Sequence, residues 1–134
     1  MMGRPTKLTQ ERQDKIVTAL RAGNYRVAAY GYAAISHQTF LNWMERGEAE
    51  SDHVKAGKKA RAKERIYLDF FDAVTRAEAA AEVEAVAMVR KAMPDDWRAA
   101  MEFLRRRHVD RWGKTVSEVT VDTPDGVALV DKMS

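Results

Sequence analysis

The sequence contains no cysteine, so the chain has no disulfide and no thiolate for catalysis or metal binding. No apolar run approaches the roughly 20 residues that a membrane-spanning helix needs. The N-terminus also lacks the apolar core of a signal peptide. These absences predict a protein that does not enter a membrane and that is suited to a reducing cytoplasm.

The sequence has equally little that indicates catalysis. It contains no phosphate-binding loop of the Walker A type, and its three histidines lie in separate segments without the spacing of metal ligands. Asp95 and Asp96 are adjacent, but they fit the start of a helix, where carboxylates interact favourably with the helix dipole. We therefore expect no enzymatic activity, no metal and no cofactor.

The positive charge of the chain is unevenly distributed. The 134 residues are 46% hydrophobic and 32% charged, with a net charge of +3. Residues 1–65 alone contain 13 Lys or Arg and 7 Asp or Glu. A segment with this excess of positive charge is expected to attract polyanions, with an affinity that falls as the salt concentration rises. A solvated basic surface is the alternative.

Residues 24–47 have a pattern that is typical of a helix-turn-helix. Ser36 is expected to cap the second helix of the motif, and Gly47 is expected to end it. Small side chains in the first helix favour a close helix crossing: Ala28, Ala29 and Gly31. Apolar side chains at three- and four-residue spacing predict one buried face of the second helix: Phe40, Trp43 and Met44.

The other faces of this second helix have side chains that can hydrogen-bond a base edge or a phosphate. The predicted DNA contacts are His37, Gln38, Thr39, Asn42 and Arg46, with Arg4, Lys7 and Arg26 as phosphate partners. An ordinary helical hairpin with a polar outer face is the alternative interpretation.

A further helix is expected to begin at Thr9 and to end at Gly23, with Asn24 capping the next one. Three helices in residues 9–47 would make a minimal trihelical DNA-binding domain, preceded by a basic arm of residues 1–8. The expected core of this domain is Ile16, Leu20, Val27, Ala28, Ile35, Phe40 and Trp43.

Residues 48–60 lack apolar periodicity and are predicted to be a linker or a loosely helical connection. Basic side chains near its end are either phosphate contacts or a solvated charge run: Lys58, Lys59, Arg61, Lys63 and Arg65.

The longest helical pattern runs from about Arg61 to Met93 and is apolar on two sides. Some 28 residues at 1.5 Å each give a rod of roughly 40 Å. Pro94 is expected at the start of a second helix that reaches about Arg107 and folds back as an antiparallel hairpin. Because two helices leave one apolar face of the rod uncovered, copies of this hairpin, residues 61–113, are expected to pack side by side.

The tail, residues 114–134, changes period. Two β-branched stretches, VSEVTV and VALV, flank the turn sequence DTPDG, which predicts a short β-hairpin. A disordered tail is the alternative.

Five stretches taken together resemble the small terminase subunit of tailed bacteriophages. In order they are GRPTKLT, RAGNY, AAISHQTFLNWMERGE, FFDAVTRAEAAAE and DDWRAAMEFLRRRHVDRWG, which run from Gly3 to Gly113. The sequence departs from the pattern at Ala34, where a Gly would be easier in the turn, and in a longer and more charged linker. The resemblance implies binding of viral DNA at the packaging site and assembly into a ring through the central hairpin. It also implies recruitment of the large terminase subunit, which has the ATPase motor and the nuclease.

The predicted fold is therefore mainly α, with an N-terminal helix-turn-helix domain, a central oligomerisation hairpin and a short β-prone tail. The predicted partners are double-stranded viral DNA, the large terminase subunit and further copies of the chain, in the host cell cytoplasm. The main alternative is a helix-turn-helix transcriptional regulator or a recombinase-associated DNA-binding protein, which would usually be a dimer on a palindrome. A pure assembly scaffold that binds no DNA is a second alternative.

Overall fold

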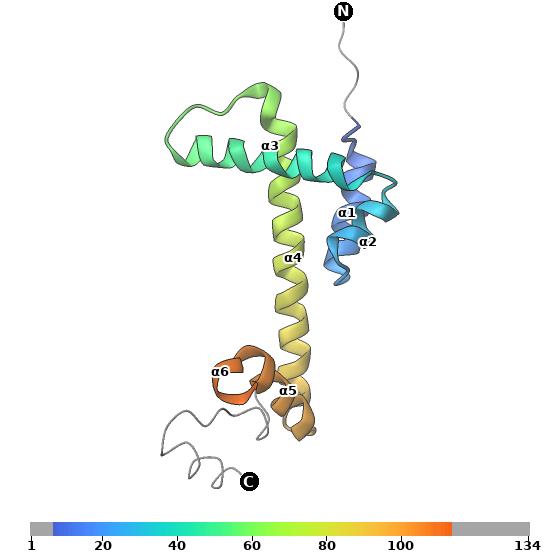
Figure 1. The fold of residues 1–134 in the computed structure, drawn as a ribbon, viewed down its shortest axis with the longest axis vertical. Coiled ribbons are helices and arrows are strands. Elements are labelled where there is room, and N and C mark those ends of the chain that lie inside the picture. The colour runs from blue at the N-terminus through green and yellow to red at the C-terminus, as the bar shows by residue number, and fades with distance from the viewer. Residues whose placement is uncertain (1–6, 114–134) are drawn as a thin grey trace, which may run out of the picture. The chain divides into compact units, whose positions relative to one another are not determined.

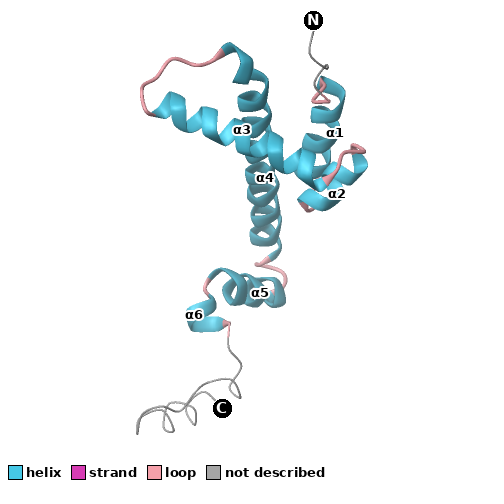
Figure 2. Cartoon of the chain, turned by 45° about the horizontal axis from the view of Figure 1, so that its top comes forward, coloured by secondary structure: helices cyan, strands magenta, loops and turns pink. Residues whose placement is uncertain are grey.

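The computed structural model describes residues 7–113, and every regular element in this range is helical (Figure 1). The elements are α1 (Gln10–Arg21), α2 (Arg26–Tyr32), α3 (His37–Lys55), the short 3₁₀ helix η1 (Ala62–Glu64), α4 (Arg65–Ala92), α5 (Trp97–Arg107) and α6 (Val109–Trp112). Helices and their connecting loops account for all of the described chain (Figure 2). The prediction of a mainly α protein is confirmed. Arg4 and the predicted hairpin of residues 114–134 lie outside the described residues.

The chain divides into two compact units, one up to Glu84 and one from Ala85 onward, and α4 contributes to both. None of the helices in residues 7–113 is long and apolar enough to cross a bilayer.

Helix α1 begins as predicted, because the Thr9 hydroxyl accepts a hydrogen bond from the Arg12 backbone N–H at 3.3 Å. The predicted cap of α2 is wrong. The Asn24 side-chain amide donates instead to the carbonyl of Ala19 at 2.9 Å, so Asn24 closes the end of α1. The N-cap of α2 is Tyr25, which makes no side-chain cap hydrogen bond.

Helix α3 also begins as predicted, with the Ser36 hydroxyl accepting from the Thr39 backbone N–H at 3.1 Å. It does not end at Gly47 but continues to Lys55, so the first half of the predicted linker is helical. Gly47 is buried where α3 crosses α4. A Cβ at this position would lie under 3.0 Å from the Tyr67 carbonyl oxygen and from the Phe71 Cβ. The missing side chain therefore permits a close crossing and does not mark a helix end.

The core of the first unit joins α1, α2 and α3 to the N-terminal half of α4. Phe70 and Val74 of α4 are fully buried. The rings of Phe40 and Trp43 meet Phe70 edge-on, with centroids at 5.9 and 5.5 Å. Helix α3 is therefore packed directly on the long helix, and the two views in Figures 1 and 2 show α3 crossing α4.

Five of the seven predicted core residues are buried: Ile16, Leu20, Ile35, Phe40 and Trp43. The other two are exposed, with Val27 at 62% and Ala28 on the same solvent side of α2. Ala29 and Ala33, four residues apart, face the core in their place. The buried face of α2 is thus rotated from the one that the sequence suggested, because small side chains let this short helix approach α1 closely.

In the second unit, Asp96 caps α5 by accepting a hydrogen bond from the Arg98 backbone N–H at 2.9 Å. Pro94 lies in the preceding turn and not at the first helical position. Helix α5 ends at Arg107 as predicted, and it has no buried residue. Trp97, at 69% exposure, is the most exposed tryptophan of the described chain. The antiparallel arrangement of the hairpin stays a prediction.

Candidate nucleic-acid interface

The turn between α2 and α3 has the hydrogen bonds of a Schellman motif. The Ile35 backbone N–H donates to the carbonyl of Tyr30 at 3.1 Å, and that of Ala34 donates to the carbonyl of Gly31 at 3.0 Å. Ala34 lies in the left-handed region with φ 60°, a conformation that costs an L-residue about 1 kcal/mol. Ile35 is buried, and its anchoring fixes the direction in which α3 leaves the turn.

The N-terminal half of α3 presents three of the predicted contacts to solvent: His37, Gln38 and Asn42. The Gln38 amide donates to the Asn42 side-chain oxygen at 2.8 Å, so the two amides are held together one turn apart. His37 Nδ1 is hydrogen-bonded to the Tyr30 hydroxyl at 3.2 Å. The amide pair still offers a carbonyl oxygen from Gln38 and N–H groups from Asn42. This combination of acceptor and donor matches the N6 and N7 groups of adenine in the major groove.

A shallow hollow of about 610 Å³ lies beside these residues. It brings together four of the eight predicted site residues, namely Lys7, Thr39, Asn42 and Arg46. Thr39 is half-buried and belongs to the helix cap, since its hydroxyl oxygen accepts from the Ser36 hydroxyl at 2.9 Å. Lys7 is exposed, and its carbonyl accepts a hydrogen bond from Arg12 at 2.6 Å. The hollow is thus bordered by the segment that precedes α1, by one face of α3 and by Tyr67 of α4.

Two of the three arginines predicted as contacts lie in the described part of the chain, and both are paired with carboxylates. Arg46 forms a two-pronged pair with Glu64 at 3.0 and 2.7 Å, and its guanidinium lies 3.9 Å from the centre of the Tyr67 ring. Arg26 pairs in the same way with Glu78, at 2.8 Å for both bonds. Arg26 of α2 therefore contacts α4 itself, and Arg46 of α3 contacts η1, which leads into α4.

These pairs change the proton affinity of their members. The hydrogen bond to Glu78 raises the pKa of Arg26, and the hydrogen bond to Glu64 raises the pKa of Arg46. The hydrogen bond from Arg46 in turn lowers the pKa of Glu64. The Arg26 pair links α2 to α4, and the Arg46 pair links α3 to η1. A DNA phosphate would have to compete with Glu78 or Glu64 for these arginines.

One important residue was missed by the sequence reasoning. Glu50 is fully buried, and its carboxylate accepts hydrogen bonds from the backbone N–H and from Nε of Arg61, each at 2.7 Å. The backbone N–H is the main cause that lowers the pKa of Glu50, despite the opposing effect of burial. The helical period could have predicted that Glu50 is buried, because Glu50 continues the spacing of the buried positions Phe40, Trp43 and Gly47 along α3.

Residues 7–113 contain no group of three or more His, Asp or Glu side chains that could hold a metal ion. Comparison of the chain with protein families, with curated proteins and with solved structures finds no match.

Proposed function

We propose that this protein is a DNA-packaging adaptor of the small terminase type, which reads duplex DNA with the exposed N-terminal half of α3. The observation that carries the proposal is the exposed Gln38–Asn42 amide pair, held at 2.8 Å on a helix whose start is fixed by the Ser36 cap. A helix can enter the major groove with its N-terminal residues at the base edges. The adjoining hollow with Lys7 at its border supplies a cation for the flanking backbone.

Self-association is the second part of the proposal. The second unit exposes large apolar side chains that a monomer would leave in water: Val86, Met88, Trp97, Val109 and Trp112. Copies of the chain packing through these residues would remove them from solvent. The order of sequence stretches between Gly3 and Gly113 that resembles small terminase subunits supports a ring as the form of this assembly, with the large terminase subunit as a further partner.

Selection of binding duplexes from a random pool tests the reading function. We expect the wild-type protein to enrich a motif and Gln38→Ala to weaken binding to it by roughly tenfold, since a good bidentate base contact contributes about 1–3 kcal/mol. Gln10→Ala is the matched control, because Gln10 makes the same kind of i,i+4 hydrogen bond, to Asp14 at 2.7 Å, on α1. Equal binding by wild type and Gln38→Ala would remove α3 as the reader.

Light scattering tests the assembly. A ring predicts a single species well above the mass of a dimer at micromolar concentration, and Trp97→Glu should reduce that mass. A stable dimer would favour a helix-turn-helix regulator on a palindromic site, which is the rival function.

A further inference from the structure

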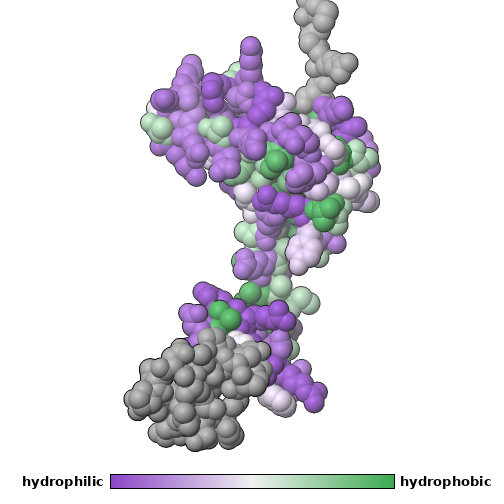
Figure 3. Space-filling model, viewed as in Figure 1, coloured by the Kyte–Doolittle hydropathy of each residue, from purple (hydrophilic) through white to green (hydrophobic). Residues whose placement is uncertain are grey.

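The segment between α3 and α4 is unusually basic. Residues 55–63, here called the basic loop, have the sequence KAGKKARAK, which contains four Lys and one Arg and no acidic residue. They include the last residue of α3 and the first two of η1. In Figure 3, the part of the first unit that has the end of α3 and this loop is predominantly hydrophilic.

The backbone of the basic loop is held at several points. Gly57, with φ +85°, turns the chain out of α3, and its N–H donates to the carbonyl of Val54 at 3.0 Å. His53 Nε2 lies 2.8 Å from the Lys59 carbonyl, which can only accept, so this nitrogen carries the proton. Five like charges in nine residues repel one another and favour an extended, solvated segment. Here, the fold holds them in one conformation.

The strongest of these restraints is the buried carboxylate of Glu50. It accepts from the Arg61 backbone N–H and from the Arg61 guanidinium, and the Nη2 to Oε1 distance is also 2.7 Å. A buried carboxylate is costly unless it is paired and hydrogen-bonded. Both oxygens of the Glu50 carboxylate bind Arg61, a residue of a surface loop. The fold therefore specifies the conformation of this loop.

The lysines of the basic loop are not neutralised. Lys58, Lys59 and Lys63 are exposed and form no ion pair with any residue between 7 and 113, in contrast to Arg26 and Arg46. Arg61, although paired, keeps 53% of its side chain exposed. Within the basic loop, the fold therefore pairs Arg61 and leaves these three lysines unpaired, and lysines are compact point charges suited to phosphates.

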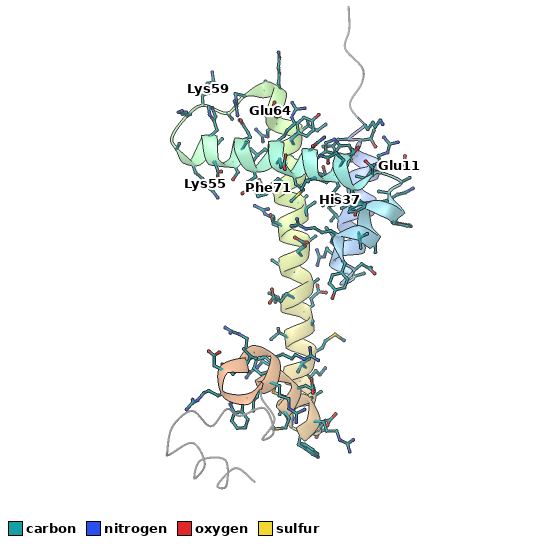
Figure 4. All side chains as sticks on the ribbon, in the orientation of Figure 1. Glu11, His37, Lys55, Lys59, Glu64 and Phe71 are labelled. Carbon is teal, nitrogen blue, oxygen red and sulfur yellow. The ribbon has the colours of Figure 1, made fainter. Side chains whose placement is uncertain are left out.

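We infer that the basic loop is a second binding surface for the phosphate backbone of duplex DNA, separate from the reading residues of α3. This inference rests on the proposed DNA-binding function and adds a site to it. His37 and Lys55 lie at opposite ends of α3 (Figure 4), about 27 Å apart at 1.5 Å per residue. Because the major groove is only about 12 Å wide, the loop would reach backbone outside the groove that the reading residues enter.

Salt-dependent duplex binding tests the inference with the full chain and duplexes of about 30 base pairs, nearly three helical turns. The variant Lys58→Gln/Lys59→Gln/Lys63→Gln should bind at least tenfold more weakly near 0.1 M salt, and equally so on every sequence. The slope of log K against log salt should fall by about 0.9 for each phosphate that the variant leaves unneutralised. Replacing the same three residues by Arg should retain the slope.

The matched control removes three exposed charges elsewhere that have no ion pair within residues 7–113, in the variant Arg76→Gln/Arg90→Gln/Lys91→Gln, and should leave the slope nearly unchanged. If the wild-type protein binds no duplex even at low salt, the proposed function fails and the inference fails with it. If the wild type binds and Gln38→Ala weakens binding, but the loop variant keeps wild-type affinity and slope, only the inference is overturned. It is also overturned if the loop lysines are needed to bind polyglutamate but not DNA, because the surface would then serve an acidic protein.

Discussion

The close crossing of α3 and α4 at Gly47 predicts how much the substitution Gly47→Ala lowers the stability of the fold. The added Cβ would lie under 3.0 Å from the Tyr67 carbonyl oxygen and from the Phe71 Cβ, where ordinary contacts lie at 3.4–4 Å. Neither atom can rotate aside, since one belongs to the backbone and the other is fixed to it. The two helices must therefore separate by several tenths of an ångström, which loosens the packing of Trp43 on Phe70.

Two effects set the magnitude. Overpacking a well-packed core costs about 1–3 kcal/mol, and the backbone contact places Gly47→Ala near the upper end, about 3 kcal/mol. Alanine gains about 1 kcal/mol over glycine in helix propensity. The net destabilisation is about 2 kcal/mol. In a chain of this size, that lowers Tm by roughly 8 °C.

Gly31→Ala is the matched control, because Gly31 is also helical but a Cβ there meets nothing within 4 Å. Because Gly31 lies in the last turn of α2, where propensity contributes less than in a helix interior, the variant should gain only about 0.5 kcal/mol, so the two variants should differ by about 2.5 kcal/mol. Urea unfolding followed by circular dichroism, at one protein concentration, measures both. If Gly47→Ala is as stable as Gly31→Ala, the close crossing does not exist as described.

Three further predictions concern the turn, the cap and the buried carboxylate. Ala34→Gly should stabilise the fold by about 0.5 kcal/mol because φ is 60°, whereas the β-branched Ala34→Val should destabilise it in the same urea assay. Ser36→Ala should cost about 1 kcal/mol, and Ser36→Gly only a few tenths, and equal losses would refute the capping role. The pKa of Glu50 is lowered from 4.5, so its stabilising effect is complete above that value and is lost as pH falls through the folded pKa. Urea midpoints of wild type and Glu50→Gln should therefore converge on acidification, and a constant gap would contradict the Arg61 contact.

The helices were predictable because their signals are local. The starts of α1 and α3 follow from Thr9 and Ser36, whose side chains cap the helices within three residues of themselves. The 28 residues of α4 follow from an apolar period that needs no knowledge of its partner. Local chemistry is sufficient wherever the interacting groups are neighbours in the sequence.

The predictions that were wrong depend on contacts between residues that are far apart in the sequence. A glycine in a helical pattern either ends the helix or lets the backbone of another helix approach closely. At Gly47 the second alternative holds because of Tyr67, which lies 20 positions away and cannot be recognised from the local sequence. Likewise, the ion pair between Arg26 and Glu78 bridges 52 positions. It gives a predicted phosphate contact an internal partner that no local pattern reveals.

The packing of α3 on α4 also determines how the chain can be divided. A fragment of residues 9–47, the natural choice from the helix-turn-helix pattern, would lack Phe70 and Val74, which are fully buried. It would leave Phe40 and Trp43 facing water on the side that α4 covers. The compact unit that contains this core extends to Glu84, and its last buried residue is Ala77. Truncations that end at Gly47 would therefore report on misfolding rather than on DNA binding.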